Sequence, residues 1–126
     1  MTTRVPSLIG IGLAGLLLLP SCGRSNGAPQ PPPPETHTVT IEGMRFDPAD
    51  LTVRAGDTIV WVNKDLFAHT ATAGQSFDSK SIDPGSSWQF TPRTAGDLPY
   101  ICALHPTMKA MVRVKATVEA TRSKVQ

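Results

Sequence analysis

The sequence lacks a strong excess of charge of either sign. It contains 12 lysines and arginines against 10 aspartates and glutamates, which gives a formal net charge of +2. Within residues 36–117 the two signs balance at eight each, so the net charge comes from the residues on either side. A neutral domain gives no support to nucleic-acid binding, and it predicts no strong electrostatic steering toward a partner of opposite charge.

The sequence also lacks an apolar run long enough for a transmembrane helix. The run from Leu8 to Leu19 has about a dozen residues, whereas a spanning helix needs roughly 20. It follows a charged start and ends in Leu19-Pro20-Ser21-Cys22. These features are typical of a bacterial lipoprotein signal over residues 1–22, with Cys22 as the lipid attachment site. We therefore predict export to the periplasm or the outer face of a membrane, with a lipid anchor; an ordinary secretory signal is the alternative.

Residues 23–35 lack any apolar periodicity that could form a core. They begin with glycine, serine and asparagine, which favour a flexible chain, and continue into the proline run Pro31–Pro34. Consecutive prolines favour an extended polyproline helix of about 3.1 Å per residue. We predict a tether that holds the following domain away from the membrane, with a proline-rich recognition motif as the alternative.

No stretch of the remaining chain has the apolar spacing of an amphipathic helix. Apolar residues alternate instead, as strands with one buried face require. Turn residues such as Asp47-Pro48 and Asp83-Pro84-Gly85 separate these runs at regular intervals. We predict about seven short strands in one antiparallel β-sandwich over residues 36–117, followed by a C-terminal tail over residues 118–126. The pairs that alternate are Val39 and Ile41, Leu51 and Val53, Ile59 and Trp61, and Val112 and Val114.

Residues that bind metals or form cross-links are scarce, with two cysteines and three histidines in the chain. If Cys22 belongs to the signal junction, Cys102 has no second cysteine with which to form a disulfide, and a metal bond is the natural role for its thiol. His105 and Met108 follow it at intervals of three residues. Thiolate, imidazole and thioether suit a metal that cycles between Cu(I) and Cu(II), whereas a thioether is a poor ligand for zinc. A buried structural or reactive cysteine is the alternative.

One further ligand has to come from outside this motif, and His37 and His69 are the candidates. His37 lies beside the proline tether, where solvent exposure and no ligand role are expected. His69 is the remaining histidine inside the domain and is therefore the expected ligand. Met44 and Met111 fall within predicted strands and are expected to be core residues.

The motif Tyr100-x-Cys-x-x-His-Pro-x-Met108, with one upstream histidine after Trp61-x-Asn63, resembles the cupredoxins, or blue copper proteins, of the amicyanin and plastocyanin type. The resemblance covers residues 36–117 and implies an antiparallel Greek-key β-sandwich with one type 1 copper. It also implies that Thr70, where the family often has asparagine, helps to link the two loops that carry the ligands, with Asn63 as a second supporting residue. The ligands that it implies are His69, Cys102, His105 and Met108.

Four protein ligands leave no open position for a substrate, so we predict an electron carrier and not an enzyme. It is expected to be a monomer that exchanges single electrons with a transient donor and acceptor protein. By resemblance, His105 would lie near the surface within a small apolar docking patch. A copper-binding or copper-delivery module is the first alternative, and a subunit of a multicopper enzyme, which needs additional histidines, is the second. The residues of the expected patch are Leu66, Phe67, Ala103, Leu104 and Pro106.

Overall fold

A computed structural model describes residues 10, 27 and 29–117 of the chain. Apart from residue 10, the predicted signal over residues 1–22 lies outside the described residues, as do its lipid attachment site Cys22, most of the tether before residue 29 and the tail over residues 118–126. Among the residues that are described, no helix is long and apolar enough to cross a membrane.

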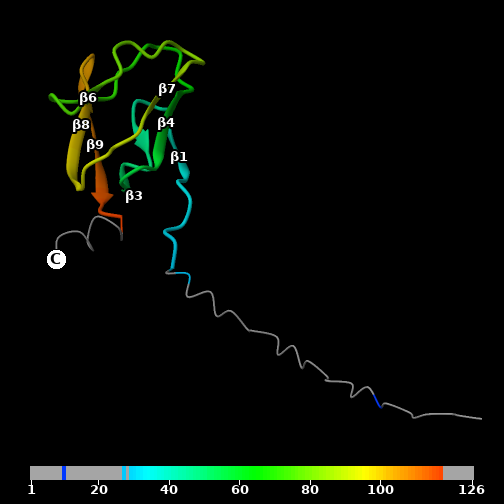
Figure 1. The fold of residues 1–126 in the computed structure, drawn as a ribbon. Helices are drawn as coiled ribbons and strands as arrows, with labels where there is room; N and C mark the ends of the chain where they lie inside the picture. Colours follow the sequence, from blue (N-terminus) through cyan, green and yellow to red (C-terminus); the bar gives the residue numbers. More distant parts are fainter. Residues whose placement is uncertain (1–9, 11–26, 28, 118–126) are drawn as a thin grey trace, which may run out of the picture.

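The described residues fold into two sheets that face each other as a sandwich (Figure 1). One sheet has four strands in the order β2-β1-β4-β7, and the other has five in the order β3-β9-β8-β5-β6. The all-β sandwich predicted from the sequence is confirmed. The strands are β1 (Thr36–Ile41), β2 (Phe46–Asp47), β3 (Asp50–Arg54), β4 (Thr58–Asn63), β5 (Thr72–Ala73), β6 (Phe77–Asp78), β7 (Ser87–Phe90), β8 (Gly96–Cys102) and β9 (His105–Lys115).

Both sheets are mixed, whereas the sequence predicted wholly antiparallel pairing. Strand β1 pairs with β4 in parallel, and β3 pairs with β9 in parallel. The expectation was wrong for these two pairs because the chain crosses from one sheet to the other between their members, so the two strands enter their sheet from the same end. The remaining pairs, including the long β8–β9 hairpin, are antiparallel.

Aromatic side chains fill the space between the sheets. Trp61 of β4 is fully buried and its ring centroid lies 5.6 Å from that of Tyr100 on β8. Its indole Nε1–H also donates to the Tyr100 hydroxyl at 3.1 Å, which gives the one polar atom of each ring a partner inside the core. Burial of this hydroxyl raises the pKa of Tyr100 to about 12, although the bond from Trp61 opposes that change.

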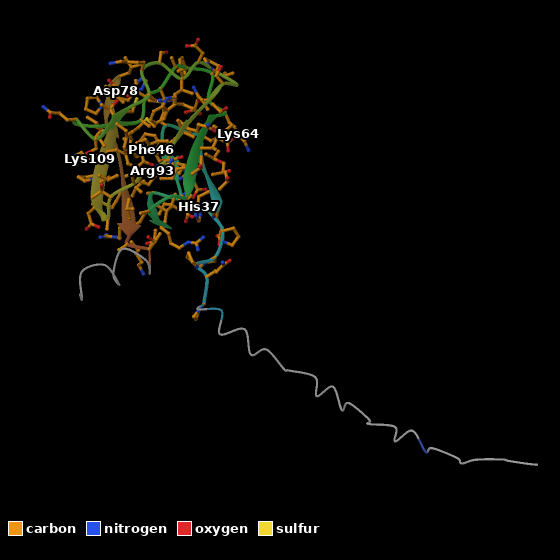
Figure 2. The ribbon with its side chains drawn as sticks, in the orientation of Figure 1. His37, Phe46, Lys64, Asp78, Arg93 and Lys109 are labelled. Carbon is orange, nitrogen blue, oxygen red and sulfur yellow. The ribbon has the colours of Figure 1, made fainter. Side chains whose placement is uncertain are left out.

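The sandwich has two distinct ends. Residues 29–35 reach the domain at the start of β1, and Figure 2 labels His37 there and Lys64, just after β4, at the opposite end. His37 was expected to be solvent-exposed, but its side chain is 23% exposed and its Nε2 lies 3.1 Å from the Asp57 carboxylate. Met44 was expected in the core of a strand, but it lies in the turn between β1 and β2, with a φ of 59° and 42% of its surface exposed.

Candidate metal centre

The β8–β9 hairpin brings together two residues of the Cys-x-x-His motif. Cys102 ends β8 and His105 begins β9, and the two residues are paired across a turn of two residues. The Cys102 side chain is fully buried, whereas His105 is half-buried. Antiparallel pairing therefore places Cys102 and His105, which are three residues apart in the sequence, directly opposite each other.

His69 approaches this hairpin from the loop between β4 and β5. It forms an isolated bridge with Ile82, in which the His69 N–H donates to the Ile82 carbonyl at 3.2 Å and the Ile82 N–H donates back at 2.7 Å. The His69 side chain is fully buried. The backbone bridge thus fixes the position of a histidine that lies 33 residues before Cys102 in the sequence.

The three side chains form a compact set of metal-binding atoms. The Cys102 Sγ lies 3.7 Å from Nδ1 of His69 and 3.6 Å from Nδ1 of His105, and the three ligand atoms all lie within 4.8 Å of one another. Bonds of about 2.0 Å to nitrogen and 2.3 Å to sulfur, opening at a near-trigonal angle, would separate nitrogen from sulfur by roughly 3.7 Å. Two imidazoles and one thiol at these distances fit a copper ion.

Met108 lies on β9, three residues after His105, and its side chain is 4% exposed. A buried thioether on the same strand as the candidate ligand His105 is of the type that can serve as a weak fourth ligand to copper. Met111, farther along β9, is partly buried.

Thr70 contacts both loops that carry the candidate ligands. Its hydroxyl accepts a hydrogen bond from the Ala103 N–H at 2.7 Å, and its own N–H donates to the Cys102 Sγ at 3.3 Å. The first bond ties the His69 loop to the β8–β9 turn. The second supplies a hydrogen-bond donor to the Cys102 sulfur from the loop that carries His69.

Asn63, at the end of β4, organises the loop before His69. Its Nδ2 donates to the carbonyls of Phe67 at 2.7 Å and Ile82 at 2.9 Å, and its Oδ1 accepts from the Asp65 N–H at 2.9 Å. Its fully buried side chain therefore has partners for both polar ends.

Asp65, which was not predicted from the sequence, contacts the far side of the His69 ring. Its Oδ2 lies 2.9 Å from His69 Nε2. The pKa of Asp65 lies below its ordinary value, mainly because the Met44 N–H donates a hydrogen bond to the carboxylate. Partial burial acts in the opposite direction and raises the pKa, whereas the Gly43 N–H and His69 lower it further. The spacing of four residues before a ligand histidine was the signal that could have drawn attention to it.

The fold and the site define a β-sandwich protein with a copper-binding set of side chains. A family model described as "Cupredoxin-like domain" matches residues 12–114. The chain belongs to the cupredoxin family. Copper is the cofactor of this family, and His69, Cys102 and His105 form the candidate site for one ion.

Relatives of known identity agree with this membership. The chain is similar to amicyanin from Paracoccus versutus, with 27% identity over 89 residues that cover 66% of this chain and 67% of that protein. It is also similar to chloroplastic plastocyanin from Tetradesmus obliquus, with 30% identity over 117 residues that cover 81% of this chain and 73% of that protein.

A larger copper protein contains a region of similar structure. The structure of the Cu-containing nitrite reductase from Thermus scotoductus SA-01 superposes with a TM-score of 0.59 and 29% identity over 68% of this chain. The chain spans 23% of the length of that enzyme. The similarity therefore concerns one part of a larger protein.

Proposed function

We propose that this chain is a blue copper protein that carries single electrons between redox proteins. The observation that supports this most directly is the group of buried His69, buried Cys102 and half-buried His105, whose ligand atoms all lie within 4.8 Å of one another. These residues would hold one type 1 copper ion, with Met108 as the axial ligand. The bound ion would supply a one-electron couple between Cu(II) and Cu(I).

The protein contributes a site whose ligands are held from several directions. The β8–β9 pairing fixes Cys102 and His105, the Ile82 bridge fixes His69, and Thr70 links the two regions. A frame of this kind keeps the ligands in nearly the same place in both oxidation states, and little reorganisation then accompanies electron transfer. This supports a carrier over a copper-delivery module, which would need a site that opens and exchanges its metal.

An electron carrier without enzymatic activity fits the ligand set better than a multicopper enzyme does. Four protein ligands would leave no position for a substrate. A second copper centre would need further histidines, and the chain has three in total. One of these, His37, is hydrogen-bonded to Asp57 at the opposite end of the sandwich.

A small apolar surface beside the site would receive the transient donor and acceptor. Leu66 is 87% exposed, Phe67 64% and Leu104 56%, and Ala103 and Pro106 are exposed as well. Exposed apolar side chains in one region mark interaction sites, and small interfaces suit brief redox encounters. The half-buried His105 would form the route of the electron through this patch.

The cellular setting proposed from the sequence is an exported monomer held at a membrane. Residues 1–22 would form the lipoprotein signal, Cys22 would carry the lipid and residues 23–35 would form the tether. The described strands run from Thr36 to Lys115, which supports a copper domain over residues 36–117.

Voltammetry and copper exchange test the proposed carrier role. The chain loaded with one equivalent of copper should give a reversible one-electron wave and should keep its copper when a chelator is added to either oxidation state. Rapid loss of copper from both states would overturn the carrier role in favour of copper delivery.

A further inference from the structure

The hydrogen bond between Asp65 and His69 determines which ring nitrogen of His69 would face the metal. His69 is fully buried, and its Nε2 lies 2.9 Å from a carboxylate oxygen that can only accept a hydrogen bond when ionised. A hydrogen bond to this oxygen therefore requires a proton on Nε2. This leaves the lone pair of Nδ1 free, and Nδ1 is the atom that lies 3.7 Å from the Cys102 sulfur.

The Asp65 carboxylate is itself fixed by the backbone of another segment. The Gly43 N–H donates to Oδ1 at 2.7 Å and the Met44 N–H donates to Oδ2 at 3.0 Å. Gly43 and Met44 have φ angles of 62° and 59°, and both N–H groups are directed at the same carboxylate. The side chain of Asp65 is 13% exposed, so water screens its charge only in part.

We propose that Asp65 is a positioning residue of the copper centre, one that fixes His69 with Nδ1 toward Cys102 and stabilises the oxidised state by its negative charge. Carboxylates that bond the outer nitrogen of a ligand histidine orient the ring and increase its basicity. Oxidised copper carries one more positive charge than reduced copper, so a nearby anion favours it more strongly. This inference rests on the proposed copper site.

A purely structural role for Asp65 makes a different prediction. The carboxylate also links the turn before β2 to the loop before His69, and loss of that link would lower stability without changing the reduction potential. The two roles can be separated by removing the charge and the hydrogen bond in different variants, since asparagine keeps an oxygen acceptor and alanine does not.

The experiment compares Asp65→Asn and Asp65→Ala with the unchanged chain. Asp65→Asn should lower the affinity for Cu(II) by about 10–100-fold and that for Cu(I) by less, so the reduction potential rises. Nitrogen NMR of the metal-free chain should show the proton of His69 on Nε2 in the unchanged chain and in Asp65→Asn. In Asp65→Ala this preference should be lost, and Asp65→Glu should restore it in part.

Asp97→Asn provides the matched control, because it removes one negative charge from an exposed carboxylate at the start of β8, at the other end of the strand from Cys102. It should leave both the potential and the His69 proton unchanged. Equal potentials in Asp65→Asn and the control would overturn the electrostatic role. An unchanged His69 proton in Asp65→Ala would overturn the positioning role.

The test remains decisive if one variant fails to fold or if the copper proposal itself fails. Should Asp65→Ala not fold, Asp65→Asn and Asp65→Glu still report the potential and the proton. If the unchanged chain forms no thiolate-bound copper, the proposed function is wrong, while NMR of the metal-free chain still decides whether Asp65 positions His69.

Discussion

The two ends of the sandwich each hold a histidine that is paired with an aspartate, but the two pairs differ in what else surrounds the ring. His69 Nε2 lies 2.9 Å from Asp65, and its Nδ1 lies 3.7 Å from the Cys102 sulfur. His37 Nε2 lies 3.1 Å from Asp57, in a group of hydrogen bonds that holds arginine and backbone N–H groups. A histidine–aspartate pair therefore does not define a metal site; the partner of the second ring nitrogen does.

The Asp57 end is organised for stability. Asp57 is 2% exposed, and its burial alone would raise its pKa. The N–H groups of Glu35 and Arg54 and the side chains of His37 and Arg54 outweigh that effect and hold the pKa of Asp57 well below its ordinary value. Arg54 also donates to the Pro33 carbonyl at 3.0 Å, so this group of residues joins the last part of the proline run to the domain.

Cys102→Ser should have the largest effect, because it removes the sulfur that gives a blue copper site its colour. We expect complete loss of the intense visible band of the copper-loaded chain, measured by absorption. His37→Gln, the matched change at the other end, should leave the band at full strength. Retention of the band in Cys102→Ser would show that the ligand assignment is wrong.

Asp57→Ala should lower the free energy of unfolding by about 3 kcal/mol. It leaves the Arg54 guanidinium and the backbone N–H groups of Glu35 and Arg54 without this acceptor. Denaturant unfolding would measure this change. The visible band and the reduction potential should stay the same. A loss below about 0.5 kcal/mol, the usual size for a surface change, would contradict the stabilising role.

Acid should weaken the same end of the molecule. The pKa of Asp57 is lowered on folding from its ordinary value of 3.8, so its contribution to stability is complete above that pH and is lost as the pH falls further. Stability measured between about pH 5 and pH 2 should fall more steeply for the unchanged chain than for Asp57→Asn. Parallel curves would show that other carboxylates govern the acid response.

Met108→Leu should keep copper bound and the band intense, but it should raise the reduction potential, because a weak axial donor favours Cu(II). We expect a shift on the order of 59 mV, which corresponds to a tenfold change in relative affinity for the two oxidation states. Voltammetry would measure it. An unchanged potential would remove Met108 from the proposed ligand set.

Thr70→Val should have the smallest effect on stability, about 1 kcal/mol, since it removes the hydroxyl that accepts from Ala103 and keeps the N–H that donates to Cys102. Copper release to a chelator should become faster. Thr58→Val removes a hydroxyl–hydroxyl hydrogen bond at the other end, where Oγ1 of Thr58 lies 2.9 Å from Oγ1 of Thr91. This change should leave copper release unaltered. Equal release from both variants would mean that Thr70 does not hold the two loops together.

The parts of the site that could be predicted are those that local spacing determines. Cys102 and His105 lie on one hairpin, where they are paired across a turn of two residues, and an antiparallel turn brings such a spacing together wherever it forms. The alternation of Val39 and Ile41 likewise predicted a strand with one buried face, and both side chains are fully buried.

The parts that could not be predicted depend on pairing between distant segments. Asp65 is held by Gly43 and Met44, which lie 22 and 21 residues away in the sequence, and they meet because β1 and β4 pair in parallel. The same pairing sets the start of β1 beside that of β4, where His37 bonds to Asp57 and becomes half-buried. Alternation of apolar residues specifies which face of a strand is buried, but not which strand lies beside it.

The spectrum of the chain during titration with Cu(II) tests the central claim most directly. The proposed copper site should give an intense blue thiolate-to-copper absorption band that saturates at one equivalent, with narrow copper hyperfine splitting in the EPR spectrum. A pale spectrum of copper bound by nitrogen and oxygen alone would show that Cys102 is not a ligand and that the proposed copper site is wrong.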